Sequence, residues 1–368
     1  MNRKVVTFVS LVLLAVLAIG QVFTAGRGFS ELENRYLESA PKLEGDAISS
    51  GEWMDRLERY LADHVPGRDT WVQLKNSVVR MSGRDQIGQV VFAEDRLIQV
   101  QDISLKQLEK NVGFISALAQ SLPADIPMTV MVAPNANWVY QELLPENTQS
   151  YDPEKAAELL EEQLSDRLQL VMPIKVLEEH KDEAIYFKSD HHWTMRGAAY
   201  AWEELAAALG VNADPFAYEV VTMGKDFKGS LYSQAPVYSF EGENFEVFQV
   251  PGLDAKWSTD LDSGAVLMKE RFQEKDQYTA FFGGNYGLVR IQNETAQSHE
   301  KLLILKDSYA NILVPFLIEE YREIIMVDLR HYKGSVRALA EAESVDRIVA
   351  VYNLDFLCTD GNFAWMGV

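Results

Sequence analysis

The residues at 190–194 read Asp-His-His-Trp-Thr and place a carboxylate beside two imidazoles. Much further along the chain, the apolar run at 302–305 leads through Lys-Asp to Ser308. A serine hydroxyl is a poor nucleophile until an imidazole accepts its proton, and a carboxylate holds that imidazole in the required tautomer. Side chains alternate along an extended segment, so we expect Asp190 and His192 to face the same side. The pattern predicts Ser308 as the nucleophile, His192 as the base and Asp190 as the carboxylate that orients it.

The same pentapeptide has the residue types of a metal site, because imidazole and carboxylate groups are good ligands for zinc or iron. A stable site needs three or more converging groups. Neighbouring side chains of a strand diverge, so we expect His191 and His192 to point to opposite sides. The other histidines show no ligand spacing with this pair: His64, His180, His299 and His331. The sequence therefore favours serine chemistry, and it predicts neither a metal nor another cofactor.

Ser308 lies between a predicted strand at 301–305 and a predicted helix with its apolar face at 312–317. The first backbone N–H groups of a helix have no partner within the helix, and the positive end of its dipole faces outward. Such a turn suits a developing oxyanion, so Ser308 could supply both a hydroxyl and an amide. Asp307 and Ser308 are also common helix caps, and capping alone would explain their position.

Strands and helices alternate along most of the chain, and this alternation predicts an α/β layered fold with a central, largely parallel sheet. Sites in such sheets form beyond the carboxyl ends of the strands. We expect the Asp190 segment to follow a strand at 185–187, and the region 211–300, which lacks a helical period, to be a β-rich insertion. The other expected elements are helices at 50–62, 70–81, 104–122, 153–168 and 194–209, two short strands within 89–98, and strands at 128–132, 323–328 and 347–352.

The N-terminus carries Arg3 and Lys4 before an uncharged run from 5 to 25. At about 1.5 Å per residue, this run spans roughly 30 Å of hydrocarbon. Positive charge before it predicts a cytoplasmic N-terminus, a retained signal anchor and a catalytic domain outside the cytoplasm. Cleavage near Ala25 is the alternative. We therefore expect three parts: an anchor at 1–25, a juxtamembrane spacer and helical segment at 26–85, and a catalytic domain at 86–368.

The charge balance limits the partners. The chain has 34 basic and 55 acidic residues, for a formal net charge of -21. Such a balance argues against nucleic acid or an anionic membrane surface as the main partner. Cys358 is the sole cysteine of the sequence, which rules out an internal disulfide and a thiolate-rich metal cluster.

Several short motifs along the chain resemble those of the DHHW family, relatives of the alginate O-acetylation proteins with SGNH-hydrolase-like catalytic domains. In these relatives the Asp-x-His pair precedes the serine, as it does here, so the resemblance implies an SGNH-hydrolase-like fold with a permuted motif order. The motifs are Glu-Asn-Arg-Tyr-Leu at 33–37, Asp-His at 63–64, Ala-Pro-Asn at 133–135, the pentapeptide at 190–194, Gly-Gly-Asn-Tyr at 283–286, Asp-Ser-Tyr-Ala-Asn at 307–311 and Asp-Leu-Arg at 328–330.

The resemblance implies transfer or hydrolysis of an acetyl group on carbohydrate hydroxyls through an acetyl-serine intermediate. It makes Asp190, His192 and Ser308 the triad, and it offers Gly284 and Asn285 as weaker candidates for oxyanion or substrate contacts. Turn formation explains the last two equally well.

Three further residues are candidates because of their position. Arg330 follows a predicted strand and could stabilise charge or hold substrate, or it could pair with Asp328. Tyr309 and Asn311 lie beside the nucleophile and are weaker candidates of the same kind.

Three functions remain open. Family resemblance and the anchor favour acetyl transfer to a surface or secreted polysaccharide, with a multipass membrane acyltransferase as the acetyl supplier. A carbohydrate acetylesterase would use the same acyl-enzyme and release the acetyl group to water. A non-catalytic glycan-binding or assembly protein would keep the three residues as structure only.

Overall fold

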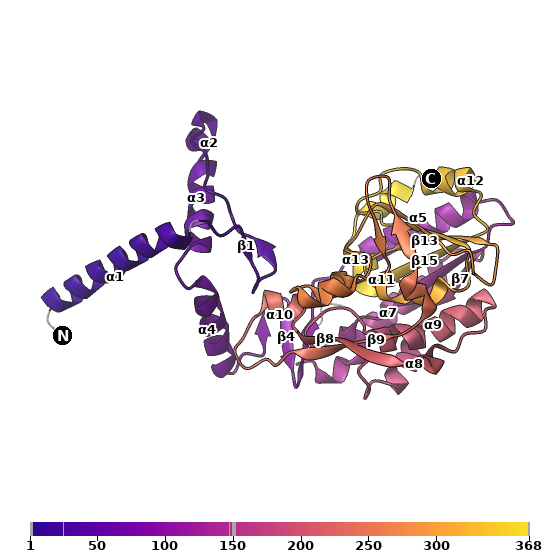
Figure 1. Ribbon diagram of the computed structural model, residues 1–368, viewed down its shortest axis with the longest axis horizontal. Coiled ribbons are helices and arrows are strands. Elements are labelled where there is room, and N and C mark those ends of the chain that lie inside the picture. Colours follow the sequence, from indigo (N-terminus) through magenta and orange to yellow (C-terminus); the bar gives the residue numbers. More distant parts are fainter. Residues whose placement is uncertain (1–2, 25, 147, 149–151, 367–368) are drawn as a thin grey trace. The chain divides into compact units, whose positions relative to one another are not determined.

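A sheet of eight strands organises the larger of two units that the chain forms, residues 89–231 and 241–368. The computed structural model describes residues 3–24, 26–146, 148 and 152–366 (Figure 1). The order across the sheet is β11 (Ser263–Ala265), β10 (Lys256–Ser258), β12 (Leu288–Gln292), β14 (Glu323–Val327), β13 (Lys301–Lys306), β15 (Arg347–Asn353), β6 (Met128–Ala133) and β7 (Leu168–Val171). In this order, neighbouring strands from β14 to β7 pair in parallel, and those from β11 to β14 pair antiparallel.

Helices cover both faces of this sheet, which is why its central strands are continuous apolar runs. Along β13, Leu302 and Ile304 face one hydrophobic core while Leu303 and Leu305 face the other. The α/β fold with a largely parallel sheet is therefore confirmed. The first core includes α9 (Met195–Leu209) and α11 (Ala310–Leu317), and the second includes α5 (Leu105–Ser121), α7 (Pro153–Gln163), α12 (Val336–Glu343) and α13 (Leu354–Thr359).

The region 211–300 is rich in strands, but it is not a separate layer. Its strands β10, β11 and β12 extend the central sheet as an antiparallel edge. Its other two strands, β8 (Val220–Phe227) and β9 (Glu243–Phe248), form an antiparallel pair with irregular register. The remaining elements of the region are α10 (Ser230–Gln234) and the 3-10 turns η2 (Pro215–Ala217), η3 (Pro251–Asp254), η4 (Lys269–Gln273) and η5 (Gln277–Ala280).

Two predicted elements differ in the structure. The expected helix at 153–168 ends at Gln163, and the chain then enters the edge strand β7. The expected strand at 185–187 is wrong, because Tyr186 makes only an isolated bridge with Trp193. The smaller elements of the sheet unit are β4 (Val90–Ala93), β5 (Arg96–Gln99), α6 (Ala136–Val139), η1 (Gln141–Leu143), α8 (Ile174–Glu179) and η6 (Asn362–Met366).

The smaller unit comprises residues 1–88 and 232–240. The predicted three-part division of the chain stays a prediction. Within the described residues, no helix combines the length and apolarity needed to cross a membrane. Ala25, the predicted end of the anchor and place of cleavage, lies outside the described residues. The elements of this unit are α1 (Arg3–Thr24), β1 (Phe29–Ser30), β2 (Arg35–Tyr36), α2 (Gly45–Ser50), α3 (Glu52–Asp63), α4 (Arg68–Met81) and β3 (Gln86–Ile87).

Candidate active site

Asp190, His192 and Ser308 form one hydrogen-bonded chain, although 116 positions separate the histidine from the serine. The Oδ1 atom of Asp190 accepts a hydrogen bond from Nδ1 of His192 over 2.6 Å. On the other side of the ring, Nε2 of His192 lies 2.7 Å from Oγ of Ser308. With the proton on Nδ1, Nε2 is free to accept the serine proton. These contacts are those that a serine nucleophile needs.

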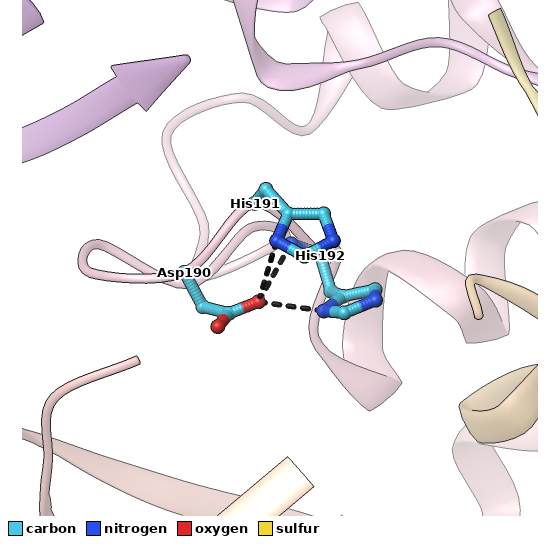
Figure 2. A group of neighbouring side chains, drawn as sticks. All are labelled: Asp190, His191 and His192. Carbon is cyan, nitrogen blue, oxygen red and sulfur yellow. Dashed lines mark hydrogen bonds and ion pairs between the residues drawn. The ribbon is translucent and has the colours of Figure 1, made fainter. Parts of the chain in front are cut away.

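The loop that carries Asp190 and His192 is a turn rather than an extended segment (Figure 2). Oδ1 of Asp190 also accepts from the backbone N–H of His192 over 3.0 Å, so the carboxylate folds its own backbone into a tight turn. The expected divergence of His191 and His192 is therefore wrong, and their ring centroids lie 3.8 Å apart. The carboxylate of Asp190 holds Nδ1 of His192, and it is the ring of His192 that contacts Ser308.

The surroundings keep Asp190 ionised. Burial of this carboxyl favours its neutral form, but the neighbouring imidazoles of His192 and His191 and the hydrogen bonds of the site favour the ionised form more strongly, so the pKa of Asp190 lies well below its usual range. One of these bonds comes from the backbone N–H of Ser230, 2.7 Å from Oδ2. Burial and the neighbouring His192 lower the pKa of His191 to about 4, so His191 is neutral at pH 7. The site thus combines a fixed carboxylate with a neutral second imidazole.

Ser308 lies in the turn between β13 and α11, at the carboxyl edge of the parallel strands. It is partly exposed, whereas Asp307 and Tyr309 on either side are buried. Oδ1 of Asp307 accepts from the backbone N–H of Tyr309 over 2.8 Å, a contact within the turn that precedes α11. The helix-cap alternative is wrong for both residues, because Tyr309 is the N-cap residue of α11 and no described side chain caps this helix. The hydroxyl of Ser308 contacts His192 instead.

Tyr309 holds the pentapeptide in place. Its hydroxyl donates to the backbone oxygen of His191, and its backbone oxygen accepts from Nε1 of Trp193 over 3.0 Å. Nδ2 of Asn135, just beyond β6, donates to the Tyr309 hydroxyl over 3.2 Å. Tyr309 is fully buried, so it positions the loop rather than contacting a substrate.

Of the other candidates, the structure brings together Asn285 and Asn311. Asn285 and Asn311 are joined by a hydrogen bond of 3.2 Å from Nδ2 of Asn311 to Oδ1 of Asn285. Gly284 has a φ of 144°, which a side chain would strain, so turn formation requires a glycine there. Arg330 makes a two-pronged ion pair with Asp328, at 2.9 and 2.6 Å, as the alternative for this residue expected.

The sequence did not indicate Tyr278, which contacts both His192 and Ser308. Its ring stacks on His192 with centroids 3.8 Å apart and planes 7° apart. Its hydroxyl donates to the backbone oxygen of Ser308 over 2.8 Å. Tyr278 lies in the 3-10 turn η5, amid many aromatic residues of the insertion, and no spacing to the motifs distinguished it.

Gly229 supplies the close approach that Asp190 needs. A Cβ atom added at Gly229 would lie 2.4 Å from both Cβ and Oδ2 of Asp190. We expect Gly229→Ala to displace this carboxylate and to lower the rate of the reaction at Ser308 by about 10²-fold. Gly361→Ala is the matched control, because a Cβ at Gly361 meets no atom within 4 Å. Equal rates for the two variants would contradict this role.

A metal is the rival occupant of this loop, since ligand atoms of Asp190, His191 and His192 lie within 4.8 Å of one another. Each residue already has a hydrogen-bond partner: Nδ1 of His191 lies 2.7 Å from Oγ of Ser230, and the other two residues belong to the chain that ends at Ser308. A metal on Asp190 and His192 would have to displace one of those contacts. Serine chemistry uses the groups as they lie, and the absence of a metal stays a prediction.

Comparisons with known proteins agree with this architecture. A family model described as DHHW protein matches residues 81–327. No curated protein sequence matches the chain. A DHHW family protein from Eubacterium siraeum is similar in structure, with a TM-score of 0.64, 20% identity, and coverage of 75% of this chain and 93% of the other. Bacillus cereus PatB1, solved with a sulfonyl adduct, gives a TM-score of 0.65, 18% identity, and coverage of 76% and 99%. At these identities the likeness shows the fold.

Proposed function

The chain belongs to the DHHW family, and on that premise we propose that it is a serine-dependent O-acetyltransferase acting on polysaccharide hydroxyls. The observation that carries this proposal is the hydrogen-bonded chain from Asp190 through His192 to Ser308. Each group has the partner that acyl transfer requires, and the serine is partly exposed while the carboxylate is buried. A glycan-binding protein would not need a hydroxyl aligned with an imidazole.

The reaction proceeds in two balanced steps. Oγ of Ser308 attacks the carbonyl carbon of an acetyl ester while Nε2 of His192 takes the hydroxyl proton. The bond to the leaving alcohol breaks, that alcohol takes the proton from His192, and an acetyl-serine remains. A sugar hydroxyl then attacks the acetyl-serine with His192 as base, and the returning proton regenerates Ser308. Asp190 stabilises the imidazolium that forms in each step.

The proposal includes a place and partners. The apolar N-terminal run anchors the protein in the cell membrane with the sheet unit outside the cytoplasm. The acceptor is a polysaccharide, and a multipass membrane acyltransferase delivers the acetyl group. With its formal net charge of -21, the protein would repel a strongly anionic polysaccharide unless the groove that binds it were locally basic. A neutral glycan is therefore the better match for the acceptor.

The test is transfer of acetyl from a chromogenic acetyl ester to neutral oligosaccharides, measured by mass spectrometry beside release of the chromophore. We expect acetylated sugar to form with the wild-type protein and not with Ser308→Ala. Acetate release without sugar acetylation would favour an acetylesterase. Equal, background rates for both proteins with every donor tried would contradict serine catalysis and favour the non-catalytic alternative.

A further inference from the structure

A buried ammonium group lies two residues before the nucleophile. Lys306 is the last residue of β13, and its side chain is 2% exposed. Side chains alternate along the strand, so Lys306 shares the face of Ile304. Its Nζ donates to Oδ1 of Asn285 over 2.8 Å and to Oδ1 of Asn311 over 2.7 Å. A cation is therefore buried on two neutral amides.

Ion pairing accounts only in part for this lysine. Oδ2 of Asp328 lies 3.8 Å from Nζ of Lys306, whereas Arg330 contacts both oxygens of the same carboxylate within 2.9 Å. Arg330 is thus the closer partner of Asp328, and Lys306 is the more distant one. Burying an ammonium costs free energy that an apolar side chain of similar size would not cost. What Lys306 adds is two hydrogen bonds to the asparagines.

The ammonium fixes the orientation of both amides. A lysine ammonium donates and cannot accept, so each asparagine must turn its oxygen toward it. Oδ1 of Asn285 also accepts a hydrogen bond from Nδ2 of Asn311, so this oxygen accepts two hydrogen bonds in total. The Nδ2 end of Asn285 must then point away from Lys306. Asn285 is exposed, whereas Asn311 is buried, so this N–H₂ group lies at the rim of the site.

The same group contacts the nucleophile's turn. The backbone N–H of Asn311 donates to the backbone oxygen of Ser308 over 3.2 Å. Lys306 therefore connects, through one asparagine, to the turn that carries the serine, and through the other to a donor at the rim. Both links come from residues in different segments, the loop before β12 and the first turn of α11.

We propose that Lys306 is a positioning residue that orients Asn285 so that its Nδ2 donates to the carbonyl oxygen of the acyl group on Ser308. This role rests on the proposed acyl-transfer function. In the tetrahedral intermediate that oxygen carries a negative charge, and a donor held in advance lowers the barrier because it need not reorient. A side chain at position 306 that cannot donate would leave the amide of Asn285 free to flip. The rate of the chemical step would then fall, whereas substrate binding would be unchanged.

A double-mutant cycle tests the role. Lys306→Met keeps the length of the side chain and removes the donors, and we expect kcat for acetyl-ester turnover to fall by about 10- to 100-fold with little change in KM. In an Asn285→Ala background the same change should cost about threefold or less, because Lys306 acts through that amide. Lys301→Met, at the other end of the strand, is the matched control and should behave as wild type.

The pH profile supplies a second readout. Burial lowers the pKa of Lys306 to about 8, with Arg330 acting in the same direction and Asp328 and Asp307 opposing it. A neutral amine both donates and accepts, so it no longer forces the amide orientation. We expect kcat to decrease as the pH rises through this range in the wild type, and this alkaline decrease to be absent in Lys306→Met.

The outcomes separate the role of Lys306 from the function itself. The proposed role of Lys306 would be overturned if Lys306→Met and Asn285→Ala lowered kcat additively, or if the alkaline decrease in kcat persisted in Lys306→Met. Turnover that still depended on Ser308 would leave the proposed function standing. No Ser308-dependent turnover in the wild type would remove both. If Lys306→Met fails to fold, Asn285→Asp is tested instead. An aspartate still accepts a hydrogen bond from Lys306, but it has an oxygen in place of the Nδ2 donor of Asn285. A wild-type kcat for Asn285→Asp would likewise reject the role.

Discussion

Replacing Ser308 by alanine is expected to lower acetyl-ester turnover by about 10⁴-fold or more, because no other hydroxyl can form the acyl-enzyme in that position. His192→Ala should cost about as much, since the hydroxyl, 2.7 Å from Nε2, then has no base. The double variant should be no worse than either single variant, because the two groups act as one unit. Steady-state kinetics with a chromogenic acetyl ester measures all three.

The control for this set is Ser263→Ala, which removes an exposed hydroxyl from β11. It should keep the wild-type rate. Thermal unfolding should place Ser308→Ala close to the wild type, since Ser308 is partly exposed. If Ser308→Ala retains more than about a tenth of the activity while His192→Ala loses it, the serine is not the nucleophile and the proposed function is wrong.

The second large effect is expected from Asp190→Asn, which keeps the size of the side chain and removes its charge. Oδ1 of Asp190 accepts from Nδ1 of His192 over 2.6 Å, and Oδ2 accepts from the N–H of Ser230. An asparagine has one oxygen for these two donors, so its N–H₂ group faces one of them. We expect kcat to fall by about 10³- to 10⁴-fold, because the imidazole loses its required tautomer and its stabilised charge.

Kinetics of Asp190→Asn beside Asp125→Asn, a change at an exposed carboxylate, provides the comparison. The two proteins should have similar far-UV circular dichroism, whereas only Asp190→Asn should lose activity. Activity within about tenfold of the wild type would show that Asp190 is a structural element of the turn and does not stabilise the imidazolium of His192 during the reaction.

The sequence by itself predicted the sheet because its evidence is local. The residues of β13 are apolar at every position from Leu302 to Leu305, which indicates a strand buried on both faces. The helices expected at 104–122 and 194–209 also rest on local signals, and α5 and α9 are present there. The strand β7 was missed because its four residues carry too short a pattern to separate from the preceding helix.

The chemical groups of the candidate site could also be predicted from the sequence, whereas their geometry could not. A carboxylate, an imidazole and a serine are recognisable by type, so Asp190, His192 and Ser308 could be named in advance. The reason given for their alignment was wrong, because the loop is a turn held by Asp190 and not a strand. A hydrogen bond between a side chain and its own backbone leaves no periodic pattern in a sequence.

Only the tertiary structure decided what surrounds these groups. Tyr278 stacks on His192, Gly229 makes room for Asp190, and Lys306 meets Asn285 and Asn311, all through contacts between distant segments. The sequence determined which chemical groups are available and which strands carry them. Packing determined their distances, burial and pKa values, because the electric environment of a group depends on neighbours that the folded chain brings together and that no local pattern encodes.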